Sequence, residues 1–158
     1  MRLILRRLAS AALVSTAAMA ACGDDDPAGP GDSPSPVSFS MNAADASGVS
    51  GTAIVTARAG EFSTVAVSLQ NLEPGSSHAG HVHRGSCAAQ GAIDFGLGPI
   101  VADAQGNGSA TTDNVPDALL IPGFYLQYHV ALDPPGAPLA CADIPNSPPP
   151  PDTGGDGY

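Results

Sequence analysis

Two neighbouring runs, Thr52-Ala53-Ile54-Val55-Thr56-Ala57 and Val65-Ala66-Val67-Ser68-Leu69, decide the fold. In the second run the apolar residues at 65, 67 and 69 alternate with small or polar ones. This period of two predicts a strand with one buried face and one solvated face. The first run is rich in β-formers, and Gly60-Glu61 lies in the short link between the two, as in a β-hairpin. This part of the chain therefore predicts antiparallel β-structure.

The same signals recur along the chain. Turns rich in Gly, Pro, Asn and Asp separate the predicted strands: Glu73-Pro74-Gly75, Gln105-Gly106-Asn107-Gly108 and Asp133-Pro134-Pro135-Gly136. Further strand candidates are Val37–Met41, His78–His83, Pro99–Asp103, Gly108–Thr112, Phe124–Leu132 and Ala140–Ile144. About eight short strands with turns every 8–12 residues predict an antiparallel sandwich or barrel with almost no helix.

Composition and charge exclude two classes of protein. The 158 residues include 19 Gly and 16 Pro, which break helical periodicity too often for a helical bundle. No Lys is present, and three of the five Arg lie in the first ten positions. Without that end, two Arg face fifteen acidic residues, a formal charge of −13. Such a chain lacks the basic surface of a conventional nucleic-acid binder.

The N-terminal segment 1–21 predicts a secretory signal, with a basic start, an apolar stretch from Leu8 to Ala18 and small residues at its end. Met19-Ala20-Ala21-Cys22 resembles the bacterial lipobox, which makes Cys22 the expected lipidated first residue of the mature protein. The alternative is an ordinary secretory signal that is cleaved nearby and leaves Cys22 unmodified.

Three segments follow the signal. Residues 22–36 predict a disordered acidic and Pro-rich tether, 37–144 the folded β domain, and 145–158 a disordered Pro-rich tail. We expect the protein in the bacterial cell envelope, anchored by lipid. Gly23 rather than an acidic residue follows Cys22, which by analogy with enterobacterial sorting indicates the outer membrane.

The four histidines are the most informative residues. His78, His81 and His83 fall within six positions, and His129 lies in a predicted strand. On a strand, His81 and His83 project from the same face, and an imidazole from a neighbouring strand would complete a three-nitrogen site. Such a site suits Cu, Zn, Fe or Ni, and copper outcompetes the others at equilibrium. The alternative is a pair of surface histidines and a core histidine bonded to backbone.

The wider pattern resembles the Cu/Zn superoxide dismutases. His78-Ala79-Gly80-His81-Val82-His83, followed by Gly85 and Cys87, is similar to their copper strand and adjoining loop. Tyr128-His129-Val130 looks like the strand that bears a further copper ligand, and Ala140-Cys141-Ala142-Asp143-Ile144 looks like the terminal strand. The resemblance implies a Greek-key antiparallel β-sandwich or barrel of about eight strands.

The resemblance also implies roles for individual residues. His81, His83 and His129 would be the copper ligands, and His78 would tie strands together beside them without binding metal. Asp133 would be the acid that hydrogen-bonds ligand histidines. Two cysteines would form the disulfide that staples a loop to the last strand: Cys87 and Cys141. Two free thiols are the alternative.

Two features of the family are missing. Segment 88–96 stands where the family has its zinc loop, but it contains no His, and Asp94 alone cannot hold zinc. Pro138 stands where the family has the Arg that attracts superoxide, and strand alternation points Arg84 away from the histidine face. The resemblance therefore implies a zinc-free copper site with, at most, weak superoxide dismutation by Cu(II)/Cu(I) cycling.

Bacterial chordin-type (CHRD) modules are a related resemblance, with a His-x-His-x-Gly strand and a strand similar to Gly123–His129. They favour an alternative function, a non-catalytic structural or adhesive surface module with vestigial histidines. A third hypothesis is a lipoprotein that binds copper but does not turn over superoxide. We expect the partners to be the membrane, through lipid, and a copper ion or superoxide, with no nucleic acid, and the protein to be a monomer or weak dimer.

Overall fold

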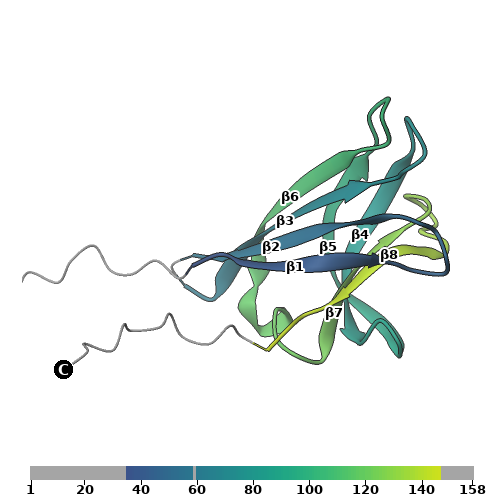
Figure 1. The fold of residues 1–158 in the computed structure, drawn as a ribbon. Helices are drawn as coiled ribbons and strands as arrows, with labels where there is room; N and C mark the ends of the chain where they lie inside the picture. Colours follow the sequence, from purple (N-terminus) through teal and green to yellow (C-terminus); the bar gives the residue numbers. More distant parts are fainter. Residues whose placement is uncertain (1–34, 59, 147–158) are drawn as a thin grey trace, which may run out of the picture. The chain divides into compact units, whose positions relative to one another are not determined.

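Eight antiparallel strands form the fold in the computed structural model, which describes residues 35–58 and 60–146 (Figure 1). A three-residue 3-10 helix, Asp117–Leu119, lies between the sixth and seventh strands. The predicted signal peptide, Cys22 and most of the predicted tether and tail lie outside the described residues. The strands are β1 Val37–Ala43, β2 Ser50–Ala57, β3 Phe62–Gln70, β4 Ser77–Gly85, β5 Gln90–Val101, β6 Gly108–Pro116, β7 Phe124–His129 and β8 Pro138–Asp143.

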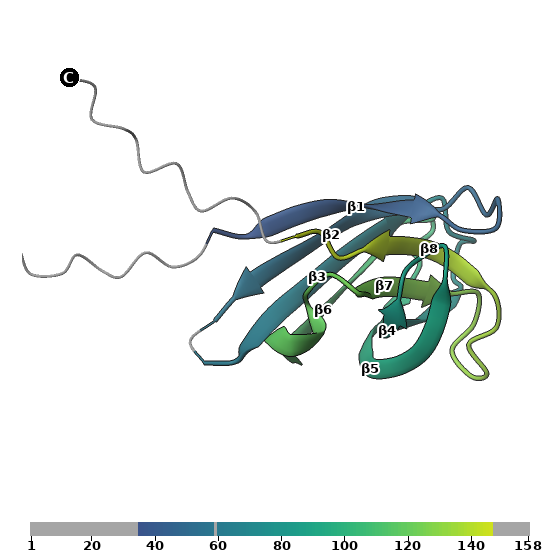
Figure 2. The same ribbon diagram turned by 90° about the horizontal axis from the view of Figure 1, so that it is seen from below.

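The strands form two layers in the order β5-β4-β7-β8-β1-β2-β3-β6. Strands β1, β2, β3 and β6 make one layer, and β5, β4, β7 and β8 make the other (Figure 2). The layers join where β1 pairs with β8 through Asn42–Cys141 and Ala43–Ala140. Pairing of β3 with β6 and of β4 with β7 requires the chain to cross between layers. This arrangement confirms the predicted Greek-key sandwich or barrel.

Side chains close the other side of the barrel, between β5 and β6. The Gly98 N–H of β5 donates to Thr112 Oγ1 of β6 at 2.7 Å. The Gly98 carbonyl in turn accepts a hydrogen bond from Tyr128 Oη of β7 at 2.9 Å. Burial raises the pKa of Tyr128, so its hydroxyl keeps the proton that it donates. Gly98 therefore links both layers, and the sheet is nearly closed.

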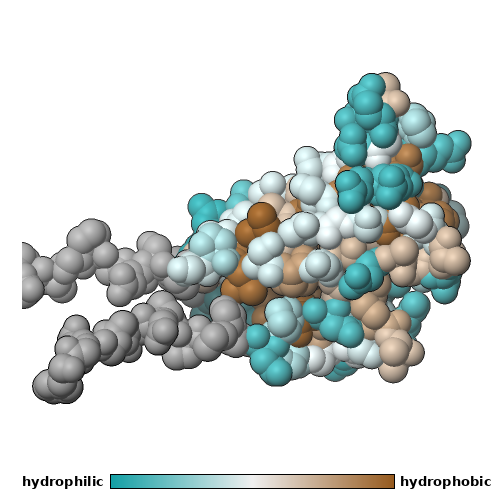
Figure 3. All heavy atoms as spheres, in the orientation of Figure 1, coloured by the Kyte–Doolittle hydropathy of each residue, from teal (hydrophilic) through white to brown (hydrophobic). Residues whose placement is uncertain are grey.

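The core lies between the layers and follows the predicted alternation. Val65, Val67 and Leu69 of β3 are all at most 2% exposed, and their side chains pack with Met41 of β1 and Leu126 of β7. Burial of these apolar side chains is the main stabilising contribution in a domain of this kind. Hydrophilic residues gather over the projecting turns at 71–76 and 102–107, at the top of the view in Figure 3. No described helix is long and apolar enough to cross a bilayer.

Several strand boundaries differ from the sequence prediction, and two of them lie beside the predicted histidines. Strand β5 begins at Gln90, not at Pro99, because residues 90–94 pair with β4 through an irregular register although they lack apolar alternation. Strand β7 ends at His129, not at Leu132, because the next residues enter a turn. In that turn the Val130 N–H donates to the Ala137 carbonyl at 2.9 Å.

Candidate metal centre

Strand alternation places the three predicted ligands on one face of the second layer. Val82 of β4 is fully buried in the core, so its neighbours His81 and His83 project from the outer face. On β7, Tyr128 faces the core, and His129 therefore projects outward as well. The two strands are antiparallel neighbours, so the histidines share a single surface.

A contact on the core side brings the two strands together. Gly80 lies opposite Tyr128 in the β4–β7 register, and a Cβ atom at Gly80 would lie 2.4 Å from Tyr128 Cζ. Only glycine leaves room for the tyrosine ring, which crosses β4 to reach the Gly98 carbonyl of β5. The close approach of the Tyr128 ring explains why residue 80, which precedes His81, is a glycine.

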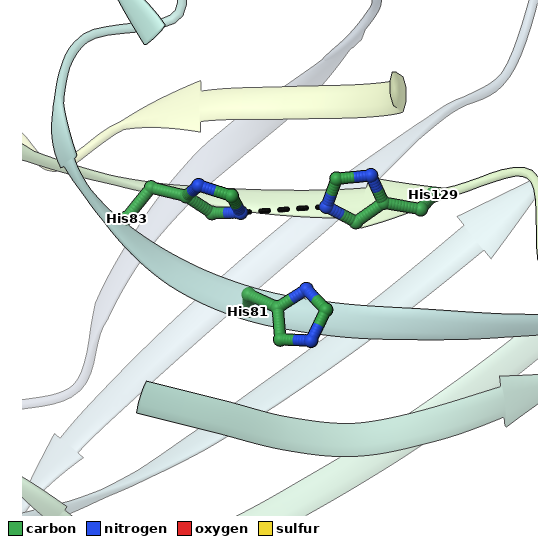
Figure 4. A group of neighbouring side chains, drawn as sticks. All are labelled: His81, His83 and His129. Carbon is green, nitrogen blue, oxygen red and sulfur yellow. Dashed lines mark hydrogen bonds between the residues drawn. The ribbon is translucent and has the colours of Figure 1, made fainter. Parts of the chain in front are cut away.

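The structure brings His81, His83 and His129 into one group (Figure 4). One nitrogen from each ring lies within 4.8 Å of the others. The Nε2 atoms of His83 and His129 lie 3.3 Å apart, and the ring of His81 lies beside them, with its centroid 5.6 Å and 5.1 Å from the other two centroids. Among the described residues, this is the group that could hold a metal ion.

Backbone carbonyls orient two of the rings. His83 Nδ1 donates to the Gly91 carbonyl and His129 Nδ1 donates to the Gly136 carbonyl, each at 3.1 Å. A carbonyl oxygen can only accept, so in neutral rings the free lone pairs are on the Nε2 atoms, which face each other. The third ring contributes His81 Nδ1, a buried atom without a hydrogen-bond partner. Three nitrogen atoms are therefore available for one cation.

Distances and protonation fit a metal ion. Two nitrogens bound to one ion at about 2.0–2.1 Å lie roughly 3.3–3.6 Å apart, which agrees with the 3.3 Å between the Nε2 atoms. Burial lowers the pKa of His81, and the nearby rings of His129 and His83 lower it further. Burial also lowers the pKa of His129; the Gly136 carbonyl opposes this shift and His83 adds to it. These two rings are thus held in the neutral form that coordination requires.

The segment that follows β4 is fixed beside the site. Cys87 and Cys141 form the disulfide that the resemblance implied, with an S–S distance of 2.01 Å. The Cys87 N–H donates to Asp143 Oδ1 at 2.7 Å. Tyr125 stacks on His83 with ring centroids 5.0 Å apart, and its hydroxyl accepts a hydrogen bond from the Gly91 N–H at 3.3 Å. The carbonyl that orients His83 is therefore held from several sides.

His78 lies beside the group and not within it. It is buried, and its Nδ1 donates to the His129 carbonyl at 2.9 Å. Its Nε2 is hydrogen-bonded to Ser76 Oγ at 2.6 Å. Both ring nitrogens are thus occupied, and the side chain links β4 to the end of β7.

Asp133 does not take the position that the resemblance implied. It is exposed, and within the described part of the chain its carboxylate makes no hydrogen bond to a histidine. The turn after β7 is short, and it brings the Gly136 carbonyl against His129 instead of the acid. The sequence analysis missed Gly91 and Gly136, because a backbone carbonyl leaves no signal in residue type.

Both described arginines are paired with aspartates. Arg84 lies on the other face of β4, where its Nε contacts Asp94 Oδ2 at 3.1 Å. Asp94 belongs to the segment that stands in place of a zinc loop, and here it forms part of β5. The second described arginine, Arg58, contacts Asp113 Oδ1 at 2.9 Å. In residues 35–58 and 60–146, no unpaired arginine is left to attract an anion.

The fold and the site together define a Greek-key β-sandwich with a three-histidine candidate metal centre. No family model and no curated protein matches the sequence. Among solved structures, the chain is similar to a double mutant of a SOD-like protein from Bacillus subtilis, with a TM-score of 0.48 and 17% sequence identity. That similarity covers 60% of this chain and 88% of the Bacillus chain.

Proposed function

We propose that this protein is a zinc-free, copper-binding, superoxide dismutase-like lipoprotein of the cell envelope. One observation carries the proposal: three imidazole nitrogens converge, His81 Nδ1 has no hydrogen-bond partner, and the Nε2 atoms of His83 and His129 contact each other while both Nδ1–H groups are bound to carbonyls. Buried polar atoms are normally paired, so an unpaired convergent set indicates a bound cation.

The donor set favours copper. It consists of three neutral imidazoles without a carboxylate or thiolate, and copper has the highest affinity of the common divalent metals for nitrogen donors. Three nitrogens can hold Cu(I) in a trigonal arrangement and leave room for a further ligand on Cu(II). No second group of ligands among the described residues offers a zinc site.

Copper in this site would supply a Cu(II)/Cu(I) couple that takes an electron from one superoxide and returns an electron to a second. The protein would hold His83 and His129 by their carbonyl partners, so that both Nε2 atoms keep their direction in either state. His81 is the least buried of the three and would provide the side from which a small molecule enters. Because both described arginines are paired with aspartates, we expect turnover to be slow.

The site's surroundings are compatible with attachment to a membrane through Cys22. Val37, where β1 begins, and Pro145, just after β8, line the same hollow. The 130–137 turn, which carries the carbonyl partner of His129, lies at the other end of the sandwich (Figures 1 and 2). A lipid anchor at the outer membrane and a monomeric or weakly dimeric state complete the proposal.

The test uses the full chain with Cys22→Ser, which removes the predicted lipid acceptor and leaves the described residues unchanged. Copper stoichiometry and superoxide decay are measured on the same sample, with His129→Ala as the comparison. We expect one copper per chain, slow catalysis, and loss of both in the variant. Retention of one copper per chain without catalysis would mean that the protein binds copper but does not turn over superoxide. No retained copper would favour the alternative, a CHRD-like structural or adhesive module.

A further inference from the structure

Two buried polar side-chain atoms in the described part of the chain lack a hydrogen-bond partner, and they belong to neighbouring residues. One is Nδ1 of His81 and the other is Nε2 of Gln127. The two residues are cross-strand partners in the β4–β7 register, so their side chains share the outer face. Gln127 is only 1% exposed although it is polar. An unpaired buried amide is unfavourable unless something else occupies its donor.

Gln127 lies on the opposite side of the histidine pair from His81. His83 is in register with Tyr125, and His129 lies four residues further along β7. A line from His83 to His129 therefore runs diagonally over the His81–Gln127 pair, with His81 on the β4 side and Gln127 on the β7 side. The rings of His83 and His129 meet along this line (Figure 4). The register thus places Gln127 beside the point where the three imidazoles converge.

The chemistry of the amide limits what it can contact. A primary amide nitrogen has two hydrogens and no free lone pair, so Nε2 can donate a hydrogen bond but cannot bind a cation. Its natural partner is an oxygen or nitrogen atom with negative charge, and hydrogen bonds to charged acceptors are stronger than those between neutral groups. Arg84 does not supply such a donor, because it is bound to Asp94 on the other face.

We propose that Gln127 is a ligand-binding residue that donates an N–H hydrogen bond to a small inorganic anion at the metal. This inference rests on the proposed copper site. A neutral donor at this position would retain an anion such as superoxide, or its analogue azide, in a protein that lacks a free cation there. Gln127 would then act on affinity for the anion and leave affinity for copper unchanged.

Azide titration of the copper-loaded full chain tests the proposal. The absorption of the Cu(II)–azide complex gives the azide Kd, and metal analysis gives the copper content. Gln127→Leu and Gln127→Met remove the donor, and Gln70→Leu is a matched control on β3 of the other layer. We expect both donor-free variants to keep one copper and to raise the azide Kd about 10-fold or more. We expect Gln70→Leu to behave as the parent chain does.

Gln127→Glu separates a donor from a metal ligand. It has nearly the same shape, but it replaces the N–H donor by a carboxylate that repels anions. We expect one copper per chain and no azide binding. Much weaker copper binding in Gln127→Leu and Gln127→Met, with a changed Cu(II) resonance spectrum, would mean that the side-chain oxygen of Gln127 coordinates metal, and would overturn the donor role.

Other outcomes are also decisive. Equal azide Kd values in the parent chain, Gln127→Leu and Gln127→Met would overturn the inference and leave the copper site standing. Failure of azide to bind the copper-loaded parent chain would do the same. Failure of the parent chain to retain copper would overturn both the proposed function and this inference.

Discussion

The Nε2 atoms of His83 and His129 lie 3.3 Å apart, while Nδ1 of each ring is hydrogen-bonded to a backbone carbonyl. Both Nδ1 atoms therefore carry hydrogen, and in neutral rings two lone pairs face each other. A metal ion bound between them relieves this arrangement. The burial that lowers the pKa values of His81 and His129 also makes the stability of the metal-free protein depend on pH.

The first prediction concerns pH. The pKa values of His81 and His129 are lowered by burial, so near pH 6 the folded protein binds fewer protons than the unfolded chain. The free energy of unfolding should therefore fall as the pH is lowered from about 7.5 to 5.5, through the ordinary histidine pKa of about 6.5. Urea unfolding of the metal-free protein at several pH values measures this slope. His81→Gln combined with His129→Gln should flatten it, and an unchanged slope in that variant would contradict the assignment.

The second prediction concerns metal. A ligand that binds only the folded state stabilises it by about 2.7 kcal/mol at a free concentration of 100 times Kd. Copper at that concentration should raise the Tm by about 10 °C for a domain of this size. Thermal unfolding with and without a chelator measures the shift. His129→Ala should abolish it. His78→Gln should lower the Tm but keep the shift, because both nitrogens of His78 are already hydrogen-bonded within the protein.

The third prediction concerns the disulfide, which links residues separated by 54 positions. In the chain-entropy account, closing a loop of this length contributes about 4 kcal/mol. Cys87→Ser with Cys141→Ser should lower the free energy of unfolding by about that amount. It should also weaken copper binding, because the Gly91 carbonyl that orients His83 lies on the released segment. Competition with a chelator of known affinity measures the second effect; equal affinities would show that the segment keeps its place without the bond.

The fourth prediction concerns two glycines with opposite surroundings. A Cβ at Gly80 would meet the Tyr128 ring at 2.4 Å, whereas a Cβ at Gly96 would have no atom within 4 Å. Gly80→Ala should cost about 1–3 kcal/mol of stability through overpacking, and Gly96→Ala should change it by about 0.5 kcal/mol or less. Urea unfolding of both variants makes the comparison. Similar losses in the free energy of unfolding for the two variants would mean that β4 and β7 can move apart at little cost in stability.

Alternation explains why much of the fold and the ligand set could be predicted. Side chains two residues apart on a strand share a face. The positions of Val65 and Val67 therefore predicted the buried face of one strand, and those of His81 and His83 predicted two imidazoles on the same face of another. The identity of the third imidazole came from a resemblance in sequence, and the β4–β7 register brings His129 to the other two.

Other parts of the site depend on geometry that residue types do not encode. The carbonyls of Gly91 and Gly136 orient the rings, and every residue has a carbonyl. Asp133 was misplaced because spacing along the chain says little about how a short turn folds. Counting back two residues from His129 would have placed Gln127 on the histidine face, but its lack of a partner became visible only in three dimensions.

The contact between Gly80 and Tyr128 joins the interior of the sandwich to its histidine face, because each residue immediately precedes a proposed ligand. A larger residue at 80, or a differently shaped one at 128, would move β4 against β7 and shift the imidazoles with them. Descendants of this gene could therefore exchange these two residues only as a pair. Inheritance of the pair would accompany inheritance of the fold as well as of the site, because Tyr128 also links β7 to β5 through the Gly98 carbonyl.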